Sequence, residues 1–461
     1  MHILGLKEII EATKGELIFG ELSTQINDIC TDSRKVMPGS LFIPIKGENF
    51  DGHAFIKECL SKGAAASLTS EDVQGLDGME GKAAVKVQDT VLALGDIARY
   101  YRGLFDIPLV GITGSVGKTS TKDMIACVLL QKFNILKTSG NFNNHIGLPL
   151  TVMNLESTHE AAVLEMGMSG LGEISYLTRI AKPDIAVITN IGMSHIEKLG
   201  SKQNILKAKM EIMEGLPEDG VVVLNGDDSL LYGLKGFLKY KTVYYGTEEG
   251  LDLQAYNVKT MGESGTCFEL TIGNRDYKIH IPVPGTHNVY NALAAIAVGL
   301  QMGVPIEDMI KGISSYSPAK MRLNIMSHKG YKVINDAYNA SPQSMESAID
   351  VLRDTSEGNR TIAVLGDMLE MGEWAYKAHF EVGRYVASKD ISYLVTVGQN
   401  GRNIANGALE AGIPIDRVFT FKDNDEVKKF LEGFVEEGDF ILVKGSRGMK
   451  MEEIAQGLMN D

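Results

Sequence analysis

The sequence predicts an α/β protein of three domains, the central one built on a doubly wound parallel sheet that carries a phosphate-binding loop. Three observations favour this fold class. The chain has 461 residues, enough for two to four domains of ordinary size. Short apolar runs that end in glycine or polar residues alternate with helical patterns, as in sheets covered by helices on both faces. A glycine-rich loop that ends in Gly-Lys-Thr stands between one such run and the helical pattern after it.

The overall charge excludes two classes of partner. Lys and Arg number 45 and Asp and Glu number 59, so the net charge is −14. Nucleic acids and anionic membranes attract basic proteins, so we expect neither as a general partner. We expect the partners to be small molecules and the chain to be a monomer.

Cysteine use and the N-terminus indicate a reducing compartment. The four cysteines form no CxxC pair, which argues against a disulfide framework or a thiolate zinc site. Glu8 and Glu11 fall where a signal peptide needs an apolar run, and no stretch reaches the ~18 uninterrupted apolar residues of a membrane span. We therefore expect a cytoplasmic protein.

Residues 1–82 are predicted to form a smaller N-terminal α/β domain. Its densest feature is Thr31-Asp32-Ser33-Arg34, which is followed by the apolar run 41–45 and by KGENFDGHAF at 46–55. The stretch 71–82 is rich in glycine and acidic residues, as loops and linkers are.

Residues 83–313 are predicted to form the central domain. Its apolar runs are typical of strands buried on both faces of a parallel sheet, and they lie at 107–113, 161–167, 184–192 and 220–228. Residues 251–282 alternate more and contain several turn sequences. We expect them to form antiparallel hairpins beside the parallel sheet.

Residues 314–461 are predicted to form a third domain, Rossmann-like and also doubly wound. SSYSPAK at 314–320 is a plausible linker before it. The runs 361–368, 392–400 and 439–448 again resemble buried strands that end in polar turns.

The clearest motif is the predicted phosphate loop, read as G-x-T-G-S-x-G-K-T from residue 111. Glycines let backbone N–H groups approach a triphosphate, and the dipole of the following helix favours negative charge. Lys118 would reach the β and γ phosphates and the Thr119 hydroxyl would bind Mg²⁺. Ile112 stands where the usual pattern has Gly or Ala, which makes the loop a variant; the alternative is an incidental glycine-rich turn. The loop residues expected at the nucleotide are Gly114, Ser115, Gly117, Lys118, Thr119 and Ser120.

Glu165 and His195 are candidate metal ligands, because each follows a predicted strand at the sheet edge where ligands bind. The alternatives are a helix N-terminal charge for Glu165 and a packing or surface residue for His195. On composition alone, Lys209 is a surface lysine. Three asparagines suit phosphate or amide groups, or else form a simple polar loop, and these are Asn141, Asn143 and Asn144.

Together these motifs resemble the Mur ligases, the ATP-dependent amide-bond ligases of bacterial peptidoglycan precursor synthesis. The resemblance rests on the phosphate loop, NFNNHIGLP, the strand-end EMG, TNIGMSHIE and PGTHNVYNALAA. These segments occur in order and cover essentially the whole chain. The resemblance implies three domains that bring ATP, a UDP-linked peptide and an amine together.

The resemblance also implies roles for individual residues around ATP and Mg²⁺. Lys118 and Thr119 would bind ATP and magnesium, and Glu165 and His195 would bind the magnesium ions. A lysine in an Ala-Lys context is carbamylated in such ligases, which points to Lys209, with Lys207 as the alternative, and replaces the surface interpretation. Metal ligands are therefore expected at Thr119, Glu165, His195 and Lys209, and catalysis at Lys118, Lys209, His195 and Arg322.

Further roles follow from the same resemblance. Asn288 and Asn291 would contact adenine, Arg322 would reach the phosphates when the domains close, and Asp336 and Tyr338 would lie on the nucleotide side. The uridine nucleotide is expected at Ser33, Arg34, Gly47, Asp51 and His53. The dipeptide is expected near Asn339, Ser341 and the KGSR segment.

Within the family, segments 334–345, 364–373 and 444–452 point to the ligase that adds D-alanyl-D-alanine to UDP-N-acetylmuramoyl-tripeptide. The resemblance implies that ATP converts the peptide carboxylate into an acyl phosphate, which the dipeptide amine attacks. Two alternatives stay open. One is a sister or folylpolyglutamate-type ligase that adds a single amino acid, and the other is a non-catalytic nucleotide switch.

Overall fold

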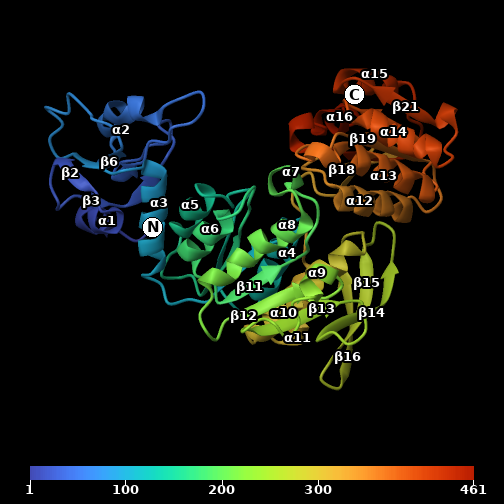
Figure 1. Cartoon of the computed structure of the whole chain (residues 1–461), viewed down its shortest axis with the longest axis horizontal. Helices are drawn as coiled ribbons and strands as arrows, with labels where there is room; N and C mark the ends of the chain where they lie inside the picture. Colours follow the sequence, from blue (N-terminus) through green and yellow to red (C-terminus); the bar gives the residue numbers. More distant parts are fainter. Residues whose placement is uncertain (461) are drawn as a thin grey trace.

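The chain folds into three α/β domains, and the middle domain lies between the other two (Figure 1). The computed structural model describes residues 1–460. Each domain has its own main sheet, of five, nine and six strands respectively. Across residues 1–460, no helix is both long enough and apolar enough to cross a membrane.

The first domain contains a five-stranded sheet in the order β2-β7-β6-β5-β4. β4 to β7 run parallel, and β2 pairs antiparallel with β7. A two-stranded ribbon, β1 with β3, lies beside it. The elements are β1 (Leu4–Gly5), α1 (Leu6–Thr13), β2 (Glu16–Phe19), β3 (Gln25–Ile26), β4 (Asp28–Cys30), β5 (Ser40–Phe42), α2 (Ile56–Lys62), β6 (Ala66–Thr69) and β7 (Ala83–Lys86).

The first sheet extends four residues past the boundary predicted at residue 82. The stretch 71–82 joins β6 to its parallel neighbour β7, so it is a loop within the domain and not a linker between domains. The cause is the short apolar strand after it, since Ala83, Ala84 and Val85 are fully buried. Glycine and acidic residues mark a turn in either setting, and here the turn returns the chain to the same sheet.

Helix α3 (Thr90–Arg102) connects the first two domains. It packs against α1 on one side and against α5 and α6 of the middle domain on the other. The Tyr101 hydroxyl donates to the carbonyl of Leu155 at 2.7 Å. The buried Arg102 guanidinium donates to the carbonyls of Ala181, Phe105 and Ile107. These bonds fix α3 to the middle domain, because a buried guanidinium without acceptors would be costly.

The middle domain contains a nine-stranded sheet in the order β16-β15-β14-β13-β12-β11-β8-β10-β9. The strands from β9 to β14 pair in parallel, and β15 and β16 extend the sheet as antiparallel strands, which confirms the hairpins predicted at 251–282. The strands are β8 (Leu109–Thr113), β9 (Ile135–Lys137), β10 (Ala161–Glu165), β11 (Ile185–Ile188), β12 (Val221–Asn225), β13 (Lys241–Gly246), β14 (Leu253–Thr260), β15 (Thr266–Ile272) and β16 (Arg275–Ile281).

Both faces of this sheet are buried, as continuous apolar runs require. Alternate residues of β8 show it: Val110 packs with α4 and α10, and Leu109 packs with α5 and α6. The helices are α4 (Lys118–Leu129), α5 (Gly147–Val152), α6 (Glu173–Ala181), α7 (Ile196–Leu199), α8 (Lys202–Met210), α9 (Ser229–Tyr232), α10 (His287–Gln301) and α11 (Ile306–Ser314).

The third domain contains a six-stranded sheet in the order β17-β18-β22-β19-β20-β21. Only β17 runs antiparallel, so the doubly wound pattern predicted from the sequence is confirmed. The elements are β17 (Asn324–His328), β18 (Tyr331–Asp336), α12 (Pro342–Thr355), β19 (Thr361–Gly366), α13 (Ala375–Ser388), β20 (Tyr393–Val397), α14 (Gly401–Glu410), β21 (Val418–Phe421), α15 (Asn424–Glu432), β22 (Phe440–Lys444) and α16 (Glu452–Gly457).

Candidate active site

A cavity of about 520 Å³ lies at the carboxyl ends of the middle-domain strands and is faced by the third domain. Ligands of doubly wound sheets bind at this edge. Most residues singled out from the sequence meet here. Those that line the cavity are Ser115, Gly117, Lys118, Thr119, Ser120, Asn141, Asn143, Asn144, Glu165, His195, Asn288, Asn291, Arg322, Asp336, Tyr338, Asn339 and Ser341.

The glycine-rich loop has the context that a phosphate loop requires, since it runs from β8 into the N-terminus of α4. Gly114 has φ +151°, and a Cβ there would lie 1.8 Å from the Thr189 hydroxyl oxygen. Gly117 has φ +85° and begins the helix. Ile112 is buried within β8 and pairs with neighbouring strands. The variant position is therefore part of the strand, where an apolar side chain is favourable.

A second loop, 189–195, holds the phosphate loop in place. The Asn190 side-chain oxygen accepts from the Val116 N–H at 2.9 Å, and the Ser115 hydroxyl accepts from the Gly192 N–H at 2.8 Å. Sequence reasoning noted Thr189-Asn190 only as a motif and missed this supporting role. The signal was available, because an Asn directly after a strand often bonds nearby backbone groups.

Lys118 folds back over its own loop. Its ammonium donates to the carbonyl oxygen of Gly114 at 2.9 Å. Burial lowers the pKa of Lys118, and Arg322 acts in the same direction, while the Glu165 carboxylate opposes them. An anion such as a phosphate would relieve both unfavourable effects, because it would restore an opposite charge.

Glu165 is the last residue of β10 and is 2% exposed. Its Oε2 accepts from the Thr119 hydroxyl at 2.9 Å, and its Oε1 accepts from the Asn143 amide at 2.7 Å. The Glu165 N–H donates to the hydroxyl of Thr138. Helix α6 begins only at Glu173, so the alternative of a helix N-terminal charge is wrong for Glu165. The hydroxyl and carboxylate oxygens form a hard donor set.

His195 precedes α7 in the left-handed region, with φ +61°. Its Nδ1 lies 2.5 Å from Oε2 of Glu370 in the third domain. Burial lowers the pKa of His195; Lys118 and Lys209 contribute in the same direction, and Glu370 opposes them. A neutral imidazole is the form that binds metals. Glu370 was not singled out from the sequence, although it lies in the conspicuous segment 364–373.

Lys209 lies on the buried face of α8 and is 2% exposed. The interpretation as a surface lysine, which composition alone favoured, is wrong because Ile205 and Ala208 turn this face of the helix into the core. Burial lowers the pKa of Lys209 well below its ordinary value, and nearby Lys118 adds to the effect. Lys207 is exposed. Within residues 1–460 no hydrogen bond or ion pair reaches the Lys209 ammonium.

The third domain contributes Arg322 to the cavity. Its Nη2 donates to the Thr119 hydroxyl at 3.0 Å, and its guanidinium lies 4.2 Å over the ring of Tyr338. Asp336 accepts from the Lys444 ammonium at 2.5 Å. Lys444 was noted only within the KGSR segment. The third domain thus places a cation directly against the end of the phosphate loop.

Asn288 and Asn291 line the cavity but also join α10 to its surroundings. The Asn291 side-chain oxygen accepts from the Thr121 hydroxyl at 2.8 Å, and its amide donates to Asn288 at 3.0 Å. His287 and Tyr290 on the same helix line the cavity as well and were missed. Burial lowers the pKa of His287 to about 4.

Three family models match successive parts of the chain. Residues 25–102 match the model described as "Mur ligase family, catalytic domain", residues 112–299 the Mur ligase middle domain, and residues 321–447 the model "Mur ligase, glutamate ligase domain". A protein of Bacillus subtilis named UDP-N-acetylmuramoyl-tripeptide--D-alanyl-D-alanine ligase is 43% identical over 456 residues, 98% of both chains. The chain belongs to the Mur ligase family.

Solved structures give the same family and the same architecture. MurF from Acinetobacter baumannii is 31% identical, and the two structures superpose with a TM-score of 0.92 over 100% of this chain and 100% of that one. MurF from Thermotoga maritima in complex with ADP is 29% identical, with a TM-score of 0.83 over 94% of this chain and 97% of that one. The three-domain Mur ligase fold predicted from the motifs is therefore confirmed.

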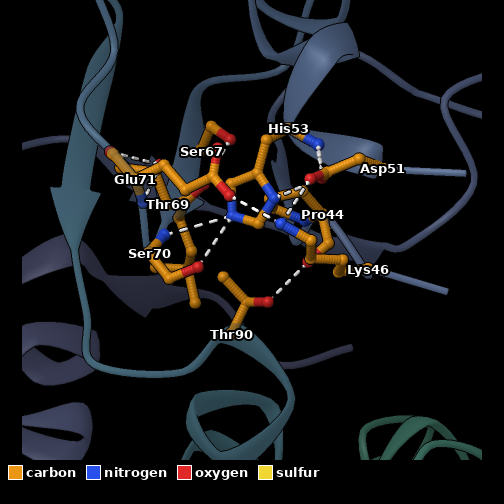
Figure 2. A network of polar contacts seen from close by, with 10 residues as sticks. Pro44, Lys46, Asp51, His53, Ser67, Thr69, Ser70, Glu71 and Thr90 are labelled. Atoms are coloured by element: carbon orange, nitrogen blue, oxygen red, sulfur yellow. Dashed lines mark hydrogen bonds and ion pairs between the residues drawn. The ribbon is translucent and has the colours of Figure 1, made fainter. Parts of the chain in front are cut away.

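The remaining candidates of this Mur ligase lie in the first domain, apart from the cavity. His53 joins Asp51 to Ser70: its Nδ1 lies 2.7 Å from Asp51 and its Nε2 lies 3.0 Å from the Ser70 hydroxyl (Figure 2). The Lys46 ammonium contacts Asp51 at 3.1 Å and Glu71 at 3.0 Å. This network fixes the shape of the loop that begins at Lys46.

The TDSR segment presents a cation at the surface of the first domain. The exposed Arg34 guanidinium donates to both oxygens of Asp32 at 2.8 Å and holds the pKa of that carboxyl well below its usual range. Ser33 is half-buried beside it. The Gly47 N–H donates to the carbonyl of Phe50, which closes the neighbouring loop. Most predicted site residues thus form two groups, one in the cavity and one in the first domain, while Lys209 and Gly114 belong to the middle domain but are not among the residues that line the cavity.

Proposed function

We propose that this chain joins D-alanyl-D-alanine to the terminal carboxylate of UDP-N-acetylmuramoyl-tripeptide, with conversion of ATP to ADP and phosphate. The 43% identity to the Bacillus subtilis ligase of that name, across 98% of both chains, supports this reaction. Amide formation from a free carboxylate is uphill in water. ATP first phosphorylates a carboxylate oxygen, the dipeptide amine then attacks the acyl carbon and loses a proton, and phosphate leaves.

The observation that carries the proposal is that three kinds of group meet in one cavity. These are a phosphate loop, a buried carboxylate and an arginine from another domain, represented by Lys118, Glu165 and Arg322. Lys118 and Arg322 are placed to stabilise the charge that develops on a transferring phosphoryl group. We propose that the adenine side of ATP lies toward Asn288, Asn291 and Tyr338 and that Asp336 faces the ribose side.

The chemistry of the residues fits magnesium. Thr119 and Glu165 offer oxygen donors 2.9 Å apart, and His195 offers a neutral imidazole. Mg²⁺ prefers oxygen ligands and keeps substrate phosphates in its coordination sphere. We propose that these three residues and Lys209 hold magnesium, which when bound neutralises charge on the phosphates.

Lys209 suits this role only as a carbamate. Burial lowers the pKa of the Lys209 amine well below its ordinary value and so favours the neutral form, which can attack CO₂, lose a proton and become an anionic carbamate. The absence of any partner for its ammonium within residues 1–460 leaves room for this change of charge. We propose Lys209, and not the exposed Lys207, as the modified residue.

The other two ligands would occupy the flanking domains. We propose that the first domain holds the UDP group through Ser33, Arg34 and the loop that contains Gly47, Asp51 and His53. Asn141, Asn143 and Asn144 line the cavity where the peptide carboxylate must reach the γ-phosphate. We propose that the dipeptide binds on the third-domain side near Asn339, Ser341 and Lys444.

An ADP-release assay tests the proposed function. We expect ADP release to require Mg²⁺, UDP-N-acetylmuramoyl-tripeptide and D-alanyl-D-alanine together, with lysine and diaminopimelate forms of the tripeptide compared as acceptors. A single amino acid that replaces the dipeptide at an equal rate would indicate a sister ligase. ADP release without any amine would indicate a nucleotide switch. Either result would overturn the proposal.

A further inference from the structure

The loop after β19 reaches across the domain interface to the candidate metal ligand His195. Nδ1 of His195 lies 2.5 Å from Oε2 of Glu370, and the Glu197 N–H donates to the carbonyl of Glu370 at 3.4 Å. We propose that Glu370 is a positioning residue that orients the His195 imidazole and thereby couples metal binding to the position of the third domain. This inference rests on the proposed function only for the identity of the metal and nucleotide.

The backbone on both sides of this contact is strained. His195 and Glu370 each have φ +61°, a region that residues with side chains rarely adopt. Such conformations cost of order 1 kcal/mol or more and persist where the surrounding structure enforces them. Gly372, with φ +50°, packs against Glu197 and completes the interface. Two strained residues that face each other indicate a contact with a function.

Glu370 is fixed to the body of the third domain. The neighbouring Leu369 N–H donates to the Ser446 hydroxyl at 2.8 Å. Oδ1 of Asp367 accepts from the N–H groups of Asn400 at 2.9 Å and Gly401 at 2.8 Å, at the start of α14. The position of the Glu370 carboxylate therefore follows the position of the third-domain sheet.

A carboxylate beside one ring nitrogen decides what the other nitrogen can do. The Glu370 carboxylate, 2.5 Å from Nδ1, favours a proton on that nitrogen, and Nε2 of His195 then keeps its lone pair and can bind a metal. Carboxylate–histidine–metal arrangements of this kind fix the tautomer and the ring orientation. Because the carboxylate belongs to another domain, metal binding must favour the docked domain as much as docking favours metal binding.

Calorimetric titration of ADP at a series of Mg²⁺ concentrations tests the role. We expect E370A to raise the half-saturating Mg²⁺ concentration about tenfold, the lower end for loss of a ligand-orienting group. E370Q, whose amide oxygen can accept from a protonated Nδ1, should stay within about threefold of wild type. The control is E373A, which removes the same charge from an exposed position of the same loop. An unchanged E370A, or an E370Q as impaired as E370A, would overturn the proposal.

Disulfide formation across the interface tests the coupling directly. A Cβ on Gly372 would lie 3.2 Å from Cβ of Glu197, so E197C/G372C places two thiols within reach. We expect Mg²⁺ and ADP to accelerate cross-linking, and E370A to abolish that acceleration. Equal acceleration with and without E370A would overturn the coupling. Neither measurement uses an acceptor or an amine, so a failed ligase assay leaves both interpretable.

Discussion

Burial determines the chemistry of the charged side chains beneath the phosphate loop. Lys118 and Lys209 lie close enough to depress the pKa of Lys209 further, and desolvation acts on both. Burial disfavours the charged forms of both lysines, because few anions lie near them to offset the loss of solvation. The site is therefore arranged for ligands that bring negative charge, which a nucleotide and a carbamate both do.

Replacement of Lys209 is the sharpest test at the residue scale. We expect K209A to lower the rate of ADP release at least about 100-fold, because a proposed metal ligand is lost, and added bicarbonate should not restore it. The matched control is K207A, which removes an exposed lysine two positions away and should leave the rate within about twofold. Wild-type-like rates in K209A would refute the role.

His287 makes stability depend on pH. Its pKa is lowered by burial to about 4, with Lys444 acting in the same direction and Asp336 and Asp350 opposing. Between about pH 6.5 and pH 4 the unfolded chain binds a proton that the folded chain does not, so acidification destabilises the fold. From pH 7 to pH 5 the loss should be about 2 kcal/mol.

Urea unfolding at pH 7 and pH 5 measures this effect. We expect H287Q to lose less stability than wild type on acidification, by about that amount. The exposed His145 provides the control, since H145Q should lose as much stability as wild type between pH 7 and pH 5. Equal losses for H287Q and wild type would show that His287 does not contribute to the pH dependence.

Sequence patterns identified residues whose role follows from local context, and missed those that act from another domain. Lys118 and Thr119 stand in a contiguous motif, and Glu165 ends a strand, so their positions in the sequence sufficed to predict that they lie together at the cavity. Glu370 and Lys444 become significant only through tertiary contacts with His195 and Asp336. The burial of Lys209 could not be read from composition, because one face of a helix is decided by what packs on it.

At the scale of elements, the turn from β8 into α4 is the most constrained part of the fold. G114A combines an unfavourable φ of +151° with a Cβ 1.8 Å from the Thr189 hydroxyl oxygen. We expect it to weaken ADP binding more than about tenfold in calorimetry, because the loop must shift to relieve the clash. G140A also has positive φ, +53°, but open space around it. This control should cost about 1 kcal/mol of stability and leave ADP binding unchanged.

Whether a segment forms a strand or a loop was easier to predict than the domain to which it belongs. The strands of the middle and third domains follow from apolar runs, since strands buried on both faces leave a continuous signal. The loop 71–82 shows the limit of this reasoning. Its composition indicates a turn, but only the pairing of β7 with β6 decides which domain continues after it.

At the scale of the whole molecule, the third domain contacts the cavity through Arg322 as well as Glu370. We expect R322A to lower kcat for ADP release about 10³-fold, with ADP binding by calorimetry changed little, because the guanidinium is proposed to stabilise the transferring phosphoryl group. R322K should restore little, since an ammonium lacks the planar fork. The exposed Lys320, two residues before Arg322, gives the control variant K320A. A kcat for R322A within tenfold of the control would contradict this role.

The hydrogen bonds of Arg102 bear on how such ligases could diversify. Helix α3 follows the first sheet in the chain, yet its last residues bond to carbonyls of the middle domain. A break between β7 and α3 would separate α3 from its contact with α1, and a break after α3 would separate it from α5 and α6. A recombination event that exchanges the first domain between relatives therefore breaks contacts of α3 wherever the chain is joined, so the exchanged parts must already fit each other at α1 or at the middle-domain helices α5 and α6.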